Sequence, residues 1–76
     1  MKELVEVIAK SLVDDPEQVV VNEKVDGSHI LIELHVASAD MGKVIGKQGR
    51  IAKAIRTVAK AVAAYNHKKV TVEIIE

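Results

Sequence analysis

Three short segments of this chain alternate apolar side chains with other types, and this alternation restricts the fold more than any other feature. In residues 29–36 one face carries only aliphatic side chains, namely Ile30, Ile32, Leu34 and Val36. Residues 70–75 repeat the pattern, and residues 19–25 follow it with Glu23 as an interruption. Successive side chains of a strand point to opposite faces, so each segment predicts a β-strand with one buried face. Such a sheet needs all of its helices on that one face.

Helical spacing marks the rest of the chain. Residues 2–13 repeat apolar side chains at this spacing. Asp14-Asp15-Pro16 should end the helix, because proline disfavours the helical conformation in the residue before it. After the second strand, Ser38 is a candidate N-cap of a short helix, with Asp40 in the first turn. A longer helix is predicted over residues 50–65.

The predicted order is therefore α-β-β-α-α-β. Asp26-Gly27-Ser28 is a turn signal that joins the first two strands as a hairpin. The two-helix crossover that follows should make the second and third strands parallel. We expect an α+β fold of two layers, with a three-stranded mixed sheet and three helices on one face. Residues 1–76, at 8.2 kDa, leave room for a single domain.

The composition excludes several classes of protein. The sequence has no cysteine, which removes disulfides and thiolate metal sites. His29 and His35 share a strand face but should lie about 20 Å apart, too far to share a metal. No apolar run approaches the roughly 20 residues that span a bilayer, and the acidic N-terminus is unlike a signal peptide. We expect a cytoplasmic protein with no cofactor, metal or membrane partner and, because no catalytic constellation is evident, no enzymatic activity.

A net charge of zero conceals a strong segregation of charge. Residues 1–40 carry nine acidic and three basic residues, whereas residues 41–60 carry six basic residues and no acidic one. At about 100° per residue, four of these cations fall in one narrow stripe of the long helix: Arg50, Lys53, Arg56 and Lys60. The aliphatic side chains Ile51, Ile55, Val58 and Val62 fall on the opposite side. A solvated helix face would show the same stripe, so charge alone decides nothing.

The segment Gly46-Lys47-Gln48-Gly49 joins the two central helices almost without a spacer. Glycine at both ends permits a tight turn and the close approach of another backbone. The next helix begins at Arg50, so its N–H groups and positive dipole end favour an anion such as phosphate at the turn. The spacing does not fit a P-loop, because Gln48 stands where that motif has Ser or Thr. A simple turn between helices would also explain the two glycines.

Residues 44–56 resemble the signature of the KH domain, a module that binds single-stranded nucleic acid; they read VIGKQGRIAKAIR. The element order is similar to the type II, bacterial form of that domain, and the resemblance covers essentially the whole chain. In its short length, the chain resembles the small KhpA-type RNA-binding proteins of bacteria. The sequence departs from the pattern at Ala52, where a large aliphatic residue is usual.

The resemblance implies single-stranded RNA as partner, with the backbone of about four nucleotides held against the GxxG turn. The RNA-binding residues that it implies are Lys43, Gly46, Lys47, Gln48, Gly49, Arg50 and Lys53. Bases would enter a groove between the two central helices and the neighbouring strand. Tyr65 is the only aromatic residue, so the bases would meet aliphatic side chains rather than stacking platforms. The resemblance also implies an RNA chaperone or post-transcriptional regulator.

Three small residues, Ala52, Ala59 and Ala63, widen the apolar arc of the long helix. Either they pack on the sheet and the first helix, or they form a dimer face. The resemblance implies a homodimer, or a heterodimer with a larger KH-containing partner. Two other functions suit the sequence: a protein–protein adaptor in which the GxxG is only a turn, and a small domain that binds or transforms a phosphorylated metabolite.

Overall fold

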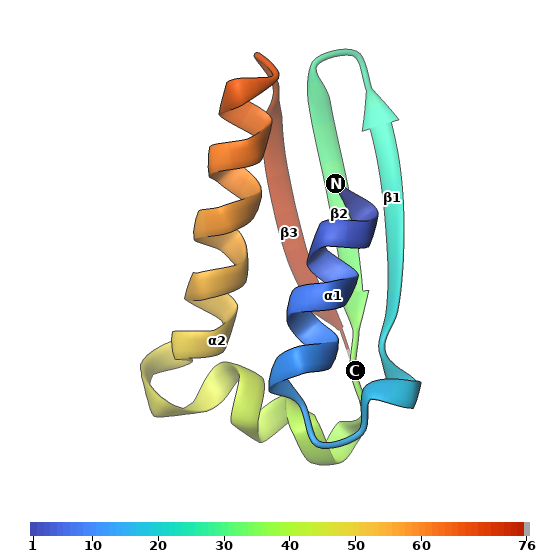
Figure 1. Ribbon diagram of the computed structural model, residues 1–76, viewed down its shortest axis with the longest axis vertical. Helices are drawn as coiled ribbons and strands as arrows, with labels where there is room; N and C mark the ends of the chain where they lie inside the picture. The colour runs from blue at the N-terminus through green and yellow to red at the C-terminus, as the bar shows by residue number, and fades with distance from the viewer. Residues whose placement is uncertain (76) are drawn as a thin grey trace.

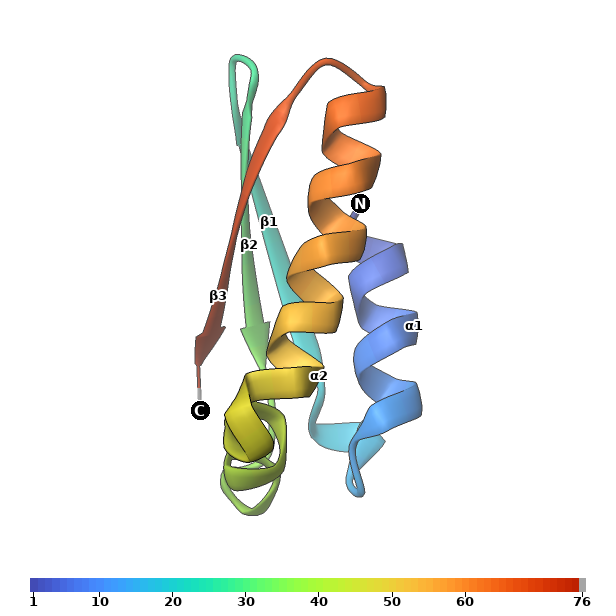
Figure 2. The same ribbon diagram turned by 90° about the vertical axis from the view of Figure 1, so that its left-hand side faces the viewer.

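The computed structural model describes residues 1–75, apart from the side chain of Lys47. Its elements, in chain order, are α1 (Lys2–Leu12), the short 3₁₀ helix η1 (Pro16–Gln18), β1 (Val20–Asp26), β2 (His29–His35), α2 (Ser38–Tyr65) and β3 (Lys69–Ile75). Figure 1 shows α1 in front of the sheet and α2 beside β3, and Figure 2 shows both helices on one side of the sheet. The predicted two-layer α+β architecture is confirmed.

The sheet has the order β1-β2-β3, with β2 in the middle. β1 and β2 form an antiparallel hairpin in which Asp26 pairs with His29 across the turn. β3 pairs with β2 in parallel, from His29 opposite Lys69 to His35 opposite Ile75. This mixed sheet is the one predicted, because a helical crossover returns β3 to the sheet in the direction of β2.

The core lies between the sheet and the helices. The predicted inner face of β2 is confirmed, since Ile30, Ile32, Leu34 and Val36 are all buried. In β1 only the first half of the predicted face is covered: Val21 is buried, whereas Val25 is 56% exposed. The reason is visible in Figure 1, where the tip of the hairpin extends past the end of α1.

The alanines of α2 belong to this core. Ala52, Ala59 and Ala63 are at most 4% exposed within the single chain. Their expected role as a dimer face is therefore wrong, and the alternative, packing within the chain, holds. The physical reason is size, because short side chains let the helix backbone approach its neighbours closely. Val58, expected on the buried side, is instead 37% exposed.

Helix α2 changes direction in its middle. Helical structure runs from Ser38 to Tyr65, but Gln48 and Gly49 have φ angles of 64° and 69°. Two residues in the left-handed region interrupt a right-handed helix. The ribbon accordingly turns there into two limbs, residues 38–47 and 50–65 (Figure 1). These limbs are the two central helices that the sequence predicts.

The start of α2 differs from the prediction. Ala37 occupies the N-cap position and Ser38 is already helical, with no side-chain cap hydrogen bond. Asp40 does lie in the first turn, as predicted, but it is buried. The expected N-cap role of Ser38 is therefore wrong.

The end of α2 is closed by two backbone hydrogen bonds typical of a Schellman motif. The His67 N–H donates to the Ala64 carbonyl at 3.0 Å, and the Lys68 N–H donates to the Ala63 carbonyl at 2.7 Å. This motif places its turning residue in the left-handed region, which glycine adopts without strain. Here that residue is His67, with a φ of 58°.

We therefore predict that His67→Gly raises the free energy of unfolding by about 1 kcal/mol, because a non-glycine residue in this region is strained. For a domain of this size, the gain corresponds to an increase in Tm of about 4–8 °C, measurable by circular dichroism. Asn66→Gly is the control: its φ is −94° and its Nδ2 donates to the Val62 carbonyl, so glycine there should lower Tm. An unchanged or lower Tm for His67→Gly would contradict this reasoning.

Candidate functional site

The candidate site begins at the bend of α2, which coincides with the GxxG segment. Gly49 occupies the left-handed region that favours glycine, while Gln48 adopts a similar conformation without being glycine. A Cβ atom placed on Gly46 would meet no atom within 4 Å outside its chain neighbours and its own helical turn, and the same is true of Gly49. The space beside Gly46 is thus open on the side where a side chain would stand.

The second limb restarts at this bend, so its N-terminal end faces the turn. The positive end of a helix dipole attracts anions, and cationic side chains add to that attraction. Arg50 and Lys53, both predicted as site residues, are exposed on this limb. The side chain of Lys47, also predicted, lies outside the part that the structure describes.

The first limb is fixed to the loop after α1 by a buried carboxylate. Asp40 is 2% exposed, and its Oδ1 and Oδ2 accept hydrogen bonds from the backbone N–H groups of Asp14 and Asp15, each at 3.1 Å. Hydrogen bonds to an ionised acceptor are stronger than neutral ones, and this pair satisfies both oxygens. The sequence analysis predicted only that Asp40 lies at the start of a helix. No sequence pattern predicts its hydrogen bonds to the backbone of Asp14 and Asp15.

Lys43, another predicted site residue, has a partner in the free chain. Its Nζ lies 3.0 Å from Oδ1 of Asp14. Both side chains are substantially exposed, at 46% and 82%, so this ion pair contributes little to stability. A phosphate could replace Asp14 at low cost.

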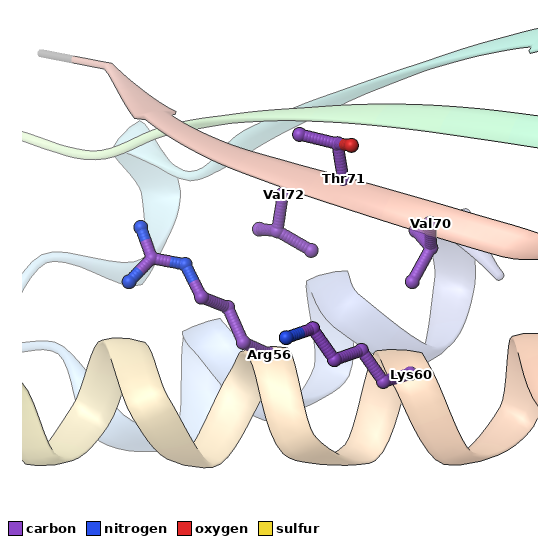
Figure 3. Close-up of a pocket in the computed structure, with 5 residues that line it drawn as sticks. All are labelled: Arg56, Lys60, Val70, Thr71 and Val72. Carbon is purple, nitrogen blue, oxygen red and sulfur yellow. The ribbon is translucent and has the colours of Figure 1, made fainter.

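A hollow of about 320 Å³ lies between the second limb and β3 (Figure 3). Arg56 and Lys60 line it from α2, and Val70, Thr71 and Val72 line it from β3. In Figure 3 Arg56 extends from the helix toward the strand and Lys60 runs along the helix, while Val70 and Val72 point back at the helix. The result is a groove with an apolar wall and a basic wall.

The sequence analysis placed Arg56 and Lys60 on the basic stripe but did not identify the β3 residues of this groove. A signal for them exists: only three residues, 66–68, separate α2 from β3. A strand that follows a helix so closely runs back along it, so its first residues lie beside the last turns of the helix. Ala52, the position that departs from the KH pattern, is buried in the core and does not line the hollow.

Other arrangements of polar groups are sparse. Among residues 1–75, apart from the Lys47 side chain, no three His, Asp or Glu side chains come together as metal ligands would. Within the same part of the chain, neither helix combines the length and apolar character that a membrane crossing demands. His29 instead meets Thr71 across the open face of the sheet, with Nε2 and Oγ1 2.9 Å apart.

Comparison with known proteins agrees with this architecture. A family model described as the KH domain of KhpA and KhpB matches residues 2–74. The chain belongs to this family.

Curated relatives share most of the sequence. "RNA-binding protein KhpA" of Clostridium perfringens is 69% identical over 75 residues, which cover 99% of this chain and 100% of the relative. The proteins of the same name from Caldanaerobacter subterraneus and Listeria monocytogenes are 63% and 53% identical, the first covering 99% and the second 100% of this chain, and each match spans the whole relative. No solved structure matches the chain.

The two glycines of the turn should respond differently to alanine. Gly46 has room for a Cβ and lies in helical structure, so Gly46→Ala should stabilise the chain by about 0.5–1 kcal/mol. Gly49→Ala should destabilise it by about 1–2 kcal/mol, because its φ is 69°. Urea denaturation followed by circular dichroism measures both changes. A change of the same sign in the free energy of unfolding for both variants would contradict the different backbone conformations of Gly46 and Gly49.

Proposed function

We propose that this chain, over residues 1–76, is one KH domain of the type II topology that binds single-stranded RNA. The name of its relatives, RNA-binding protein KhpA, supports RNA as the ligand. The observation that carries the proposal is the bend of α2: it presents the open space beside Gly46 and the start of a cationic limb at the same place.

In this proposal the sugar–phosphate backbone of about four nucleotides lies against residues 46–49. Gly46 and Gly49 let the RNA approach the protein backbone. Lys47 and Arg50 neutralise the phosphates nearest the turn, and Gln48 contributes a hydrogen bond to the same RNA backbone. The turn contacts the RNA through its sugar–phosphate backbone, which is the same for every base. Contact at the turn alone is therefore weakly selective for RNA sequence.

Lys43 and Lys53 contact outer phosphates, one on each limb. Lys43 exchanges its carboxylate partner Asp14 for phosphate when RNA binds. Both pairs are ionic and exposed, so the exchange is nearly balanced and leaves the fold undisturbed.

The bases turn toward the groove between α2 and β3, where Val70 and Val72 provide an apolar wall. The one aromatic side chain, Tyr65, is 87% exposed on the second limb and is not among the residues that line this hollow. Without aromatic stacking, which contributes about 1–3 kcal/mol per base, one chain binds one site with modest affinity. Modest, weakly selective binding suits an RNA chaperone or post-transcriptional regulator better than a reader of one sequence, and it requires no catalytic group.

The turn is tested by Lys47→Asp combined with Gln48→Asp. These changes remove one positive charge and add two negative charges beside the RNA backbone, and aspartate tolerates the left-handed region at Gln48. We expect loss of the electrophoretic shift of an unstructured RNA, with an unchanged circular dichroism spectrum.

A matched control carries the same change of charge elsewhere. Lys2 on α1 and Gln18 in η1 are exposed, so Lys2→Asp with Gln18→Asp should retain most of the binding. Retained RNA binding by the folded Lys47→Asp, Gln48→Asp variant would discard the model in which the turn holds the RNA.

We further propose that the chain pairs, with a second copy or with a larger KH-containing partner. Two linked sites gain avidity on a longer RNA, which compensates for modest affinity at each site. The pairing surface is distinct from the buried alanines of the core; Val58 and Tyr65 are large apolar side chains that α2 exposes.

Sedimentation velocity of the purified chain tests self-pairing. For a symmetric pair, the mass derived from sedimentation should be twice the 8.2 kDa of one chain. This mass should fall toward that of one chain as the protein is diluted. A mass of 8.2 kDa at all concentrations would exclude the homodimer and leave only the heterodimer.

A further inference from the structure

The loop after α1 places a carboxylate on one of the cations that the proposed function assigns to RNA. Oδ1 of Asp14 accepts a hydrogen bond from Nζ of Lys43 at 3.0 Å, and the Asp14 side chain is 82% exposed. The exposed cations Arg50 and Lys53, on the second limb, have no carboxylate within 4.0 Å among the described side chains. Of these three cations, only Lys43 is therefore paired before RNA binds.

The position of Asp14 is fixed through its backbone. The Asp14 N–H donates to Oδ1 of Asp40, a residue that is only 2% exposed, and the Asp15 N–H donates to Oδ2 of the same carboxylate. Asp40 and Lys43 lie three residues apart on the first limb, so they are neighbours on the helix. One helical turn thus holds the backbone of Asp14 through Asp40 and contacts its side chain through Lys43.

Asp14 contacts the same ammonium group that an RNA phosphate would contact. Lys43 precedes Gly46 by three residues, about 4.5 Å along the helix axis, so a strand at the turn passes close to Asp14. Because Asp14 belongs to the same chain, its effective concentration at Lys43 is high and constant, whereas RNA must arrive from solution. A displaced Asp14 also keeps its negative charge near the strand, and like charges repel each other. RNA therefore gains less from Lys43 than from a cation without a partner.

We infer that Asp14 lowers the affinity of the chain for RNA by competing with phosphate for Lys43, and that Asp40 is the positioning residue that keeps Asp14 there. The inference rests on the proposed function, because it requires a phosphate at Lys43. It extends that function by assigning a residue that acts against binding.

The competition also changes the response to salt. Salt weakens RNA binding, because fewer counterions are released from the strand as the salt concentration rises. Salt also screens the exposed pair of Asp14 and Lys43, which frees Lys43 for phosphate. The two effects oppose each other, so Asp14 makes the affinity for RNA less dependent on salt concentration.

The test measures binding of an unstructured RNA of about twelve nucleotides to Asp14→Asn by fluorescence anisotropy. Asparagine keeps the shape of the side chain and removes its charge. Affinity should rise about threefold at low salt, as expected for the loss of one exposed ion pair, and the gain should shrink as salt is raised to about 0.3 M. The Tm should stay unchanged, because an exposed pair contributes little to stability.

Asp15 provides the matched control. It is exposed, its N–H is held by the same Asp40 carboxylate, and it has no cation within 4.0 Å among the described side chains. Asp15→Asn removes the same charge one residue away, so affinity should change by less than about 1.5-fold.

Lys43→Gln separates competition from simple repulsion. In the Asp14→Asn background, Lys43→Gln should lower affinity about threefold, because Lys43 then contributes its full contact with phosphate. In wild-type protein the same change should cost clearly less, because Lys43 first has to leave Asp14. The two changes are therefore not additive.

The inference is overturned by any of three results: no gain in affinity for Asp14→Asn, an equal gain for Asp15→Asn, or an equal gain with and without Lys43→Gln. None of these results affects the turn, because Lys47→Asp with Gln48→Asp tests it separately. If wild-type protein and Asp14→Asn both fail to bind the RNA, the proposed function fails together with the inference.

Discussion

The whole structure depends on a sheet that can be covered on one side only. β2 directs Ile32 and Leu34 to the buried face and Glu33 and His35 to the other, so both helices must pack on the same side. With three strands and an 8.2 kDa chain, there is little apolar area to spare. The second limb of α2 covers the apolar face with alanines, whose short side chains bring the helix close to the sheet. Its larger charged side chains are thereby confined to the opposite side and to the rim beside β3.

The bend of α2 allows one continuous helical segment both to pack along the core and to cross the end of the sheet. The second limb follows the core, while the first limb crosses the end of the sheet and is held by the carboxylate of Asp40. That carboxylate accepts hydrogen bonds from the backbone of residues 14–15 and so joins the loop after α1 to the limb before the turn. The GxxG turn is therefore supported from both sides by contacts that do not involve it, and the turn itself remains open.

Much of this could be predicted from the sequence, because local rules determine it. Alternation gave the strands and their buried face, and the glycines at 46 and 49 gave the bend. The errors concern packing. Amphipathic spacing predicted which side of the second limb is apolar. It could not show whether Ala59, on that apolar arc, packs in the core of its own chain or against a partner. The partners of Asp40 lie 25 and 26 positions away in the chain, beyond the reach of any local pattern. The N-cap at Ala37 instead of Ser38 is a shift of one residue, which helical spacing does not resolve. The β3 wall of the groove was missed although the short connection at residues 66–68 indicates it.

The open face of the sheet carries an arrangement that looks unfavourable by itself. Glu33 of β2 and Glu73 of β3 stand side by side in the parallel register, with one cation, Lys24, 3.7 Å from the first of them. Like charges on neighbouring strands repel each other. These carboxylates lie on the face of the sheet opposite the cations of the second limb, so a chain of zero formal net charge has an uneven distribution of charge. Such a distribution disfavours a polyanion at the open face of the sheet and favours one at the second limb.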